Sequence, residues 1–334
     1  MHRVRLIRSF TIAVALAFAL GAMGTMGTME EARAQAYPAK SIRLVVPFPA
    51  GGTTDVVARM ISQKLNEAFG QPVLVDNRPG AGGNIGAEIV ATAPPDGYTL
   101  LVCSPAEVTI NLSLYKKMPY DPVKSFAPIT LATSAPLVLV VHPSLPVHTV
   151  KELIALARSK PGQLVYASSG TGGPQHLSAE LMKSMANIDM VHVPYKGGAP
   201  AIADLLGGHV QLFFAGIPPA LPHVRAGKLR SIAVTSAKRT QILPSMPTIS
   251  ESGLPGFAID NWQGVLAPGN TPREIVTRLN AEIVKALLLP EVRQRLFEQG
   301  TEPVATSPQQ FEAYIKSEIE KYAQIIRKSG AKAD

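Results

Sequence analysis

The sequence is poor in the features that mark several common classes of protein. It has a single cysteine in 334 residues, which excludes an intramolecular disulfide framework and leaves no set of thiolates for a zinc or iron–sulfur site. Only 17% of the residues are charged and 6% are aromatic, whereas 46% are hydrophobic, so the chain can bury a large core and is not intrinsically disordered. The length favours two domains.

Motifs of the common nucleotide-binding and hydrolytic enzymes are also missing. Residues 80–86 lack the third glycine of a dinucleotide-binding fingerprint, because Ile85 stands in its place. No phosphate-binding loop, no G-x-S-x-G nucleophile and no H-E-x-x-H pair occurs, and Cys103 lies in a strand-like run that predicts a buried, inert thiol. We therefore expect no catalytic residue, no metal and no cofactor.

The N-terminus has the order of a secretory signal peptide. A basic stretch over residues 2–8 precedes an apolar stretch over residues 10–20, and Ala32 and Ala34 supply small residues at the −3 and −1 positions of a cleavage site. A membrane anchor is the alternative, but the strongly apolar stretch is short for a span of roughly 20 residues. The pattern predicts cleavage near Ala34 and export to the periplasm.

The positive charge gives little indication of nucleic-acid binding. Removing residues 1–34 takes away four arginines and two glutamates, which lowers the net charge from +8 to +6. The remaining lysines and arginines are dispersed, with no basic stripe among aromatic residues, so no nucleic-acid partner is expected. A mild positive field that attracts small anions is the better interpretation.

From residue 37 onward, short β-branched runs alternate with helical periodicity. Val57, Ile61 and Leu65, for example, share one face of a predicted helix. The alternation predicts two α/β lobes, each with a mainly parallel sheet flanked by helices. The predicted strands are 42–46, 72–75, 98–103, 137–141, 164–167, 190–193, 210–214, 229–235 and 262–266. The predicted helices are 55–68, 84–93, 150–158, 175–185, 199–206, 272–288 and 308–328.

Three glycine-rich turns, each between a predicted strand and a predicted helix, are the main candidate binding elements. They cover residues 47–55, 167–174 and 194–198. Glycine allows tight backbone conformations, and a helix N-terminus presents unpaired N–H groups and a partial positive charge, which suit a carboxylate or a phosphate. Ligands of open α/β sheets bind beyond the carboxyl ends of the strands, where such turns gather. Each turn on its own is also compatible with a simple connection.

Several longer motifs resemble the Bug-type solute receptors of tripartite tricarboxylate transporters. These motifs are Tyr37-Pro38 with residues 47–52, the Asn-Arg-Pro-Gly-Ala-Gly-Gly-Asn run over residues 77–84, and residues 96–100, 120–122, 193–197, 205–208 and 253–257. The resemblance covers nearly all of the chain after the signal peptide. It implies a type II-like, two-lobed periplasmic binding protein with a ligand cleft between the lobes, made of residues 35–134 and 257–334 on one side and 135–256 on the other.

The resemblance also implies which residues contact the ligand. The first turn would hold a carboxylate, the second and third turns would contact the ligand from the other lobe, and Asn84 and the loop after Cys103 would border the cleft. His176, in the first turn of a predicted helix, is a weaker candidate and is equally compatible with a packed imidazole. The candidate ligand-binding residues are Phe48, Ala50, Gly51, Gly52, Thr53, Asp55, Asn84, Glu107, Ser168, Ser169, Thr171, Gly172, His176, Tyr195, Lys196, Gly197 and Ala215.

Two departures from the family pattern bear on the ligand. Family members often carry an Asp-Asn pair where this chain has Ala215-Gly216, and small hydroxyl residues where it has Pro105-Ala106-Glu107. Glu107 would disfavour a second ligand carboxylate if it faces the cleft, but it is equally compatible with a position in solvent.

The expected function is that of a monomeric periplasmic receptor. It would close its lobes by a hinge motion over a small carboxylate and deliver this ligand to membrane transporter subunits. Two alternatives stay open, namely a periplasmic enzyme acting on similar acids through Ser169, Thr171 or His176, and a sensing subunit for a membrane kinase.

Overall fold

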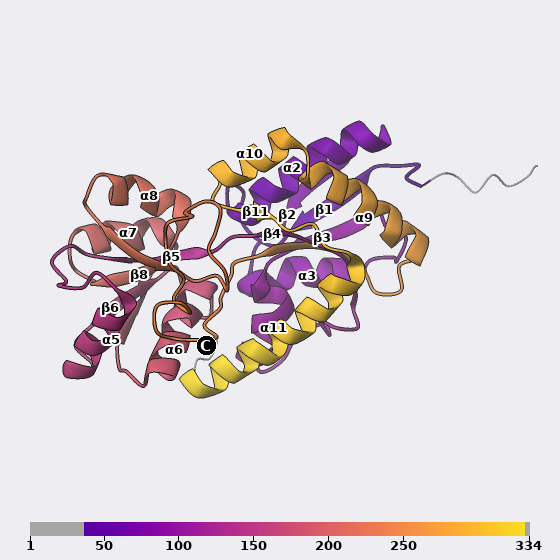
Figure 1. Ribbon diagram of the computed structural model, residues 1–334. Coiled ribbons are helices and arrows are strands. Elements are labelled where there is room, and N and C mark those ends of the chain that lie inside the picture. The colour runs from indigo at the N-terminus through magenta and orange to yellow at the C-terminus, as the bar shows by residue number, and fades with distance from the viewer. Residues whose placement is uncertain (1–36, 331–334) are drawn as a thin grey trace, which may run out of the picture. The chain divides into compact units, whose positions relative to one another are not determined.

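The computed structural model describes residues 37–330, so the predicted signal peptide lies outside the described residues. Within this range, none of the helices combines the length and the apolar character that crossing a membrane requires. Residues 40–330 contain two β-sheets, each with helices on both faces (Figure 1).

The elements follow one another mostly as short strand–helix units. The strands are β1 (Ile42–Val46), β2 (Val73–Asn77), β3 (Thr99–Cys103), β4 (Phe126–Ser134), β5 (Leu137–Val141), β6 (Val165–Ser168), β7 (Val191–Pro194), β8 (Leu212–Gly216), β9 (Arg230–Val234), β10 (Gln263–Pro268) and β11 (Glu302–Pro303). The α-helices are α2 (Thr53–Phe69), α3 (Asn84–Ala91), α4 (Asn111–Leu114), α5 (Val150–Ser159), α6 (Pro174–Ala186), α7 (Gly198–Leu206), α8 (Ile217–Arg225), α9 (Arg273–Leu287), α10 (Pro290–Glu298) and α11 (Pro308–Ser329). A 3₁₀ turn, η1 (Ala81–Gly83), and a π-helical turn, η2 (Ala106–Ile110), precede α3 and α4.

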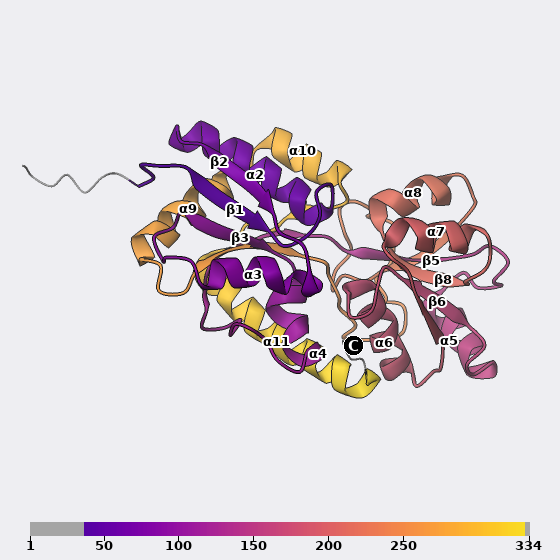
Figure 2. The ribbon, with the colours of Figure 1, turned by 180° about the vertical axis from the view of Figure 1, so that it is seen from behind.

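The first sheet has the strand order β11-β4-β10-β3-β1-β2. The strands β2, β1 and β3 are parallel, whereas β10, β4 and β11 join by antiparallel pairing. Figures 1 and 2 show α2, α9 and α10 on one face and α3 and α11 on the other. Trp262, Phe311 and Leu101 are buried together between the sheet and α11, so the last helix of the chain completes a core that the first strands begin.

The second sheet has the strand order β7-β6-β8-β5-β9. Its strand β5 shows why both faces must be covered, because successive side chains of a strand point to opposite faces. Leu137, Leu139 and Val141 pack in one apolar cluster with α5 and α6, and Val138 and Val140 pack in another with α7 and α8. A strand that is apolar on both faces is stable only between two layers of helices.

The two sheets are connected by two stretches of chain that lie side by side. The first passes from β4 to β5, and the second returns from β9 to β10. They meet where Pro136 and Asp260 form an antiparallel bridge and where the Asn261 N–H donates to the Ala135 carbonyl at 3.1 Å. Because these two short stretches are the connections between the sheets, they are a natural place for two lobes to rotate about.

The prediction of two α/β sheets is confirmed, but their strands are not mainly parallel. In the first sheet three of the five pairings are antiparallel, and in the second sheet two of the four are. The sequence patterns did not predict β4, β11, α4, α8 or α10, whereas the predicted helix over 272–288 agrees with α9. Proline-rich composition concealed α8, because Pro218 and Pro219 stand in its first turn and Pro222 in its interior.

Candidate functional site

A cavity of about 440 Å³ lies between elements of the two sheets. The first sheet contributes the start of α2 and the loop after α10, and the second contributes the starts of α6, α7 and α8, with both connecting stretches between them. The lining residues are Gly51, Gly52, Thr53, Val56, Ala135, Pro136, Leu137, Gln175, Gly198, Ile202, Phe213, Gly216, Ile217, Pro218, Pro219, Asn261, Gln299 and Gly300.

Four helices begin at this cavity, and each begins at a glycine. The N-cap residues are Gly52 for α2, Gly173 for α6, Gly197 for α7 and Gly216 for α8, and none of them provides a side-chain cap. Among the helices whose starts do not line the cavity, α5 and α11 are capped by a threonine and a serine side chain, whereas α3 begins at Gly83 without a side-chain cap. None of the four starts has a side-chain cap, so the N–H groups present there can donate to an anion from outside. Proline has no N–H, so Pro174 of α6, Pro200 of α7 and Pro218 and Pro219 of α8 supply none, and α2 presents the fullest set.

The side chains that line the cavity carry no charge. Its polar side chains are Thr53, Gln175, Asn261 and Gln299, and the rest of the lining is aliphatic, aromatic, proline or glycine. Positive potential at this cavity comes from helix N-termini rather than from lysine or arginine. Such a site can hold an anionic ligand by neutral hydrogen bonds, and it offers no carboxylate to pair with a cationic group.

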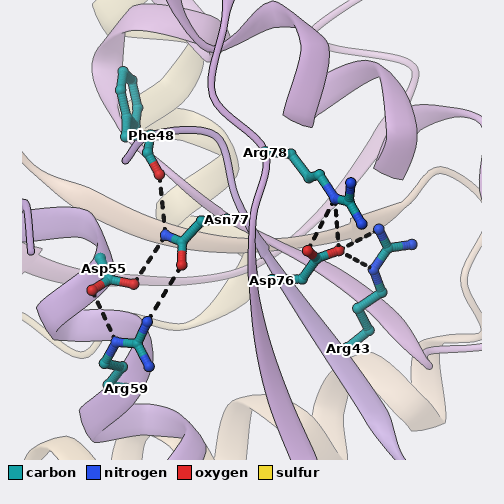
Figure 3. A network of polar contacts seen from close by, with 7 residues as sticks. All are labelled: Arg43, Phe48, Asp55, Arg59, Asp76, Asn77 and Arg78. Atoms are coloured by element: carbon teal, nitrogen blue, oxygen red, sulfur yellow. Dashed lines mark hydrogen bonds and ion pairs between the residues drawn. The ribbon is translucent and has the colours of Figure 1, made fainter. Parts of the chain in front are cut away.

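The first glycine-rich turn is held by a network of polar side chains (Figure 3). The carboxylate of Asp55 accepts hydrogen bonds from the Gly51 N–H at 2.9 Å, from Arg59 Nε at 2.9 Å and from Asn77 Nδ2 at 3.0 Å. Asn77 Nδ2 also donates to the Phe48 carbonyl at 3.1 Å. The network fixes both ends of the turn, so the free amides that follow Gly51 point from a rigid backbone.

Asp55 therefore supports the site from behind rather than lining it. Its side chain is buried, with 2% of the residue exposed. Burial alone would raise the pKa of Asp55, but the hydrogen bonds from Arg59, Gly51 and Asn77 outweigh this and hold the pKa below its usual value. A carboxylate that stays ionised keeps the turn anchored over a wide pH range.

Of the other first-turn candidates, only the glycines and Thr53 reach the cavity. Gly51, Gly52 and Thr53 line it, Ala50 is exposed, and Phe48 is half-buried. The Phe48 ring lies against Gly83, where an added Cβ would be 3.3 Å from it. Phe48 thus joins the first turn to the loop before α3 instead of lining this cavity.

Asn84 and Glu107 are buried next to each other behind that loop. Asn84 Oδ1 accepts hydrogen bonds from Asn111 Nδ2 at 2.8 Å and from the Tyr120 hydroxyl at 3.0 Å. Glu107 is fully buried and accepts hydrogen bonds from the N–H and the hydroxyl of Ser104 at 2.6 and 2.7 Å. Glu107 consequently faces neither the described cavity nor solvent. The sequence left open a position in the cleft and a position in solvent, and the structure has neither.

The second glycine-rich turn leads to the cavity, but none of its own residues lines it. Gln175, one residue after Pro174, lines the cavity, whereas Ser168, Gly172 and His176 are buried behind it. Ser169 is half-buried and Thr171 is exposed. Gly172 instead packs on Leu114 of the first sheet's α4, where an added Cβ would be 2.3 Å from Leu114 Cδ2.

The third turn reaches the cavity through Gly198. The Gly197 N–H is used by the second turn, because it donates to the Ser169 carbonyl at 3.2 Å. The Tyr195 hydroxyl donates to Asp204 Oδ2 at 2.7 Å, and burial together with this bond raises the pKa of Tyr195 to about 12. Lys196 is exposed, and Ala215 is buried in β8, where it pairs with Val138.

Several lining residues were missed by the sequence analysis. Gln175, Asn261 and Gln299 are single amides without a surrounding motif, and nothing in their local sequence marks them. Gly216 was noted only as part of a departure from the family pattern, although its position after a strand and before Pro218 and Pro219 is the same signal that marked the other turns. Within the described part of the chain, no three His, Cys, Asp or Glu side chains gather as a metal site would need.

The two sheets, their two connecting stretches and the cavity between them define a two-lobed solute-binding protein. A family model described as "Tripartite tricarboxylate transporter family receptor" matches residues 57–331, and the chain belongs to that family of periplasmic receptors. The family consists of solute-binding receptors rather than enzymes, so the enzymatic alternative is wrong. Its members work with the subunits of a membrane transporter.

Individual relatives agree with this assignment over most of their length. Protein BugT of Bordetella pertussis (strain Tohama I) is 39% identical over 311 residues, which are 93% of this chain and 95% of BugT, so the Bug-type resemblance is confirmed. The structure of R. palustris Rpa4515 with adipate is 41% identical with a TM-score of 0.78, and the match covers 89% of this chain and 99% of that one. MatC from Rhodopseudomonas palustris with bound malate is 33% identical with a TM-score of 0.73, covering 87% and 100%.

Proposed function

We propose that this receptor binds a small dicarboxylate in the cavity between its two sheets and delivers it to a tripartite tricarboxylate transporter. The observation that carries the proposal is the meeting of four glycine-capped helix N-termini, from both sheets, at a cavity without charged side chains. The N-terminus of α2 comes from one sheet and those of α6, α7 and α8 from the other. A ligand with a carboxylate at each end satisfies both sides at once.

The apolar part of the lining supports a ligand with a hydrocarbon middle. Val56, Ile202, Phe213 and Ile217 are among the lining residues. Two relatives with TM-scores above 0.7 were solved with dicarboxylates, adipate in one and malate in the other. Between these, the apolar lining favours adipate, because each buried CH₂ group contributes about 0.8 kcal/mol whereas a hydroxyl needs a hydrogen-bond partner.

The lobes of the receptor are proposed to be residues 35–134 with 257–334 and residues 135–256. Strand membership supports this division, since β4 and β10 belong to the first sheet and β5 and β9 to the second. We also propose that the chain is cleaved near Ala34 and acts as a monomer in the periplasm. The basic and apolar stretches before Ala34 support export.

A binding panel tests the ligand class. The protein is purified from the periplasm without refolding, and thermal unfolding is followed with adipate, malate, a monocarboxylate of equal length and aspartate. Adipate at 100 times its dissociation constant should add about 2.7 kcal/mol to the free energy of unfolding. Aspartate should add less, because no lining carboxylate pairs with its ammonium group. No stabilisation by any dicarboxylate would contradict the proposal.

A charge placed at the start of α8 tests where the ligand lies. Gly216 has a φ of −61° and a ψ of 140°, and a Cβ there would be in ordinary contact with Pro219 Cγ at 3.5 Å, so a side chain fits without strain. Gly216→Asp should lower adipate affinity at least tenfold, because it adds a carboxylate to the lining of the cavity that repels the ligand. Gly216→Asn has the same size without the charge and is the matched control. Equal affinity of the two variants would place the ligand elsewhere.

A further inference from the structure

Three aromatic rings are stacked directly behind the second glycine-rich turn. Tyr166 of β6, His192 of β7 and His176 of α6 lie nearly parallel, with interplanar angles of 14° to 19°. The ring centroids of His176 and His192 are 4.1 Å apart, and those of Tyr166 and His192 are 4.9 Å apart. Pairing of β6 with β7 sets Tyr166 opposite His192, and the first turn of α6 places His176 beside them. Neither histidine lines the cavity.

Each imidazole holds a different part of the loop over residues 169–173. The Gly172 N–H donates to His176 Nδ1 at 3.1 Å. His192 Nε2 is 2.6 Å from the Ser168 hydroxyl oxygen, which in turn contacts the carbonyl and the N–H of Gly170 at 3.0 and 3.3 Å. A nitrogen that accepts from a backbone N–H cannot carry a proton, so His176 must be neutral at Nδ1 for the loop to keep this conformation.

The surroundings of the stack favour neutral imidazoles. The charged and titratable groups that act on it are Glu180 and Lys183 of α6 and Tyr166 of β6. Glu180 Oε1 is already occupied, because it accepts hydrogen bonds from the Tyr166 hydroxyl at 2.5 Å and from Lys183 Nζ at 3.0 Å. Burial lowers the pKa of His176, and burial followed by the neighbouring His176 lowers the pKa of His192 to about 4.

We infer that His176 and His192 are positioning residues that keep the loop over residues 169–173 in its ligand-binding conformation only while both are neutral, so that the receptor loses affinity for its ligand on acidification. The inference rests on the proposed function, since this loop leads into Gln175 and the start of α6 at the cavity. A proton on His176 Nδ1 would oppose the Gly172 N–H, and two imidazolium rings at 4.1 Å would repel each other.

The pH range of the effect follows from the shifts. The unfolded chain takes up a proton on each histidine near the ordinary value of 6.5, whereas the folded loop resists until about pH 4 at His192. The stabilisation of the loop is therefore complete above pH 6.5 and is lost as the pH falls toward 4. Affinity should be constant between pH 7 and 8 and should decline as the pH falls toward 4.

Two substitutions at one position separate the hydrogen bond from the proton. In His176→Asn the amide oxygen takes the place of Nδ1, accepts from the Gly172 N–H and cannot be protonated in this range. In His176→Phe the ring is kept and the acceptor is lost. At pH 7 the Phe variant should bind adipate about tenfold more weakly than the wild type, because one buried N–H loses its partner, and the Asn variant should bind within about threefold of it. His148→Asn, at an exposed histidine in the loop before α5, is the control.

The test measures the association constant for adipate by calorimetry from pH 7.5 to 4.5, for the wild type and for His176→Asn. The ratio of the wild-type constant to that of the variant is compared across this range, because the titration of adipate itself cancels in it. The ratio should fall as the pH is lowered from 7.5 to 4.5, because burial lowers the pKa of His176 without removing its titration. A constant ratio, or equal affinities of the Asn and Phe variants, would overturn the inference while leaving the function intact. The protection factor of the Gly172 amide, measured by NMR without ligand and relative to the intrinsic exchange rate at each pH, should fall over the same range. This measurement decides the role of the histidines even if adipate does not bind, and an unchanged protection factor would refute it.

Discussion

Gly300 offers the sharpest test of whether this arrangement of the two sheets is the one that binds ligand. It follows α10, lines the cavity and has a φ of +65°, and it packs against Pro218 in the first turn of α8. A Cβ on Gly300 would lie 2.3 Å from Pro218 Cδ and 2.5 Å from Pro218 Cγ. A proline ring cannot rotate away, so the loop and α8 would have to separate by roughly 1 Å to reach ordinary van der Waals contact.

The expected effect of Gly300→Ala has two parts. A side chain in the left-handed region costs about 1–2 kcal/mol of stability wherever it is placed. Gly227→Ala is the matched control for this part, since Gly227 has a φ of +68° and no atom within 4 Å of the added Cβ. The steric part belongs to Gly300→Ala alone, and overpacking of this size costs about 1–3 kcal/mol, or roughly 5- to 150-fold in affinity.

Calorimetric titration with adipate measures the difference between the two variants. Gly300→Ala should bind at least fivefold more weakly than Gly227→Ala. Pro218→Ala removes the two clashing ring atoms, and the double variant with Gly300→Ala should recover most of the affinity. Equal binding by Gly300→Ala and Gly227→Ala, or no recovery in the double variant, would refute the reasoning.

The contact of Gly172 with Leu114 of α4 should be disturbed less by an added Cβ than the contact of Gly300 with Pro218. A Cβ on Gly172 would lie 2.3 Å from Leu114 Cδ2, but this atom is the end of a flexible side chain that can adopt another rotamer. The comparison shows why the partner of a glycine matters more than the distance alone.

Two further predictions concern buried carboxylates. Asp55→Asn should weaken adipate binding and lower the free energy of unfolding by about 1–3 kcal/mol, because the Gly51 N–H loses its charged acceptor. Asp76→Asn is the control, since it affects arginine pairs away from the turn (Figure 3) and should leave adipate binding unchanged. Equal losses of binding in the two variants would contradict the role of Asp55. Burial raises the pKa of Glu107 from 4.5 to about 7, so its contribution to the free energy of unfolding is full below pH 4.5 and falls by up to about 3 kcal/mol as the pH rises through 7. Glu107→Gln, which can still bond to Ser104, should flatten this slope in denaturant unfolding from pH 4.5 to 8, and an unchanged slope would show that the carboxyl is not the cause.

Local patterns in the sequence were sufficient for most of the elements. The helical spacing of Val57, Ile61 and Leu65 predicted α2, and the apolar run at 137–141 predicted β5 with both faces buried. Such patterns record which side chains face the core. Core-facing side chains recur every two residues in a strand and every three to four residues in a helix. The partners of β4 and β10 could not be predicted in this way, because antiparallel pairing joins segments more than 100 residues apart.

The sequence by itself determined the classes of contact at the site. Gly51, Gly52 and Gly198 stand at turns where only backbone amides can face a ligand, and the motifs around them identified the family. The tertiary structure decided which groups meet. It brought Gln175, Asn261 and Gln299 to one cavity, and it withdrew Glu107 and Asp55 into hydrogen-bonded positions behind the surface. The physical reason is that a side chain's role depends on its burial and its partners, and these come from segments that are distant along the chain.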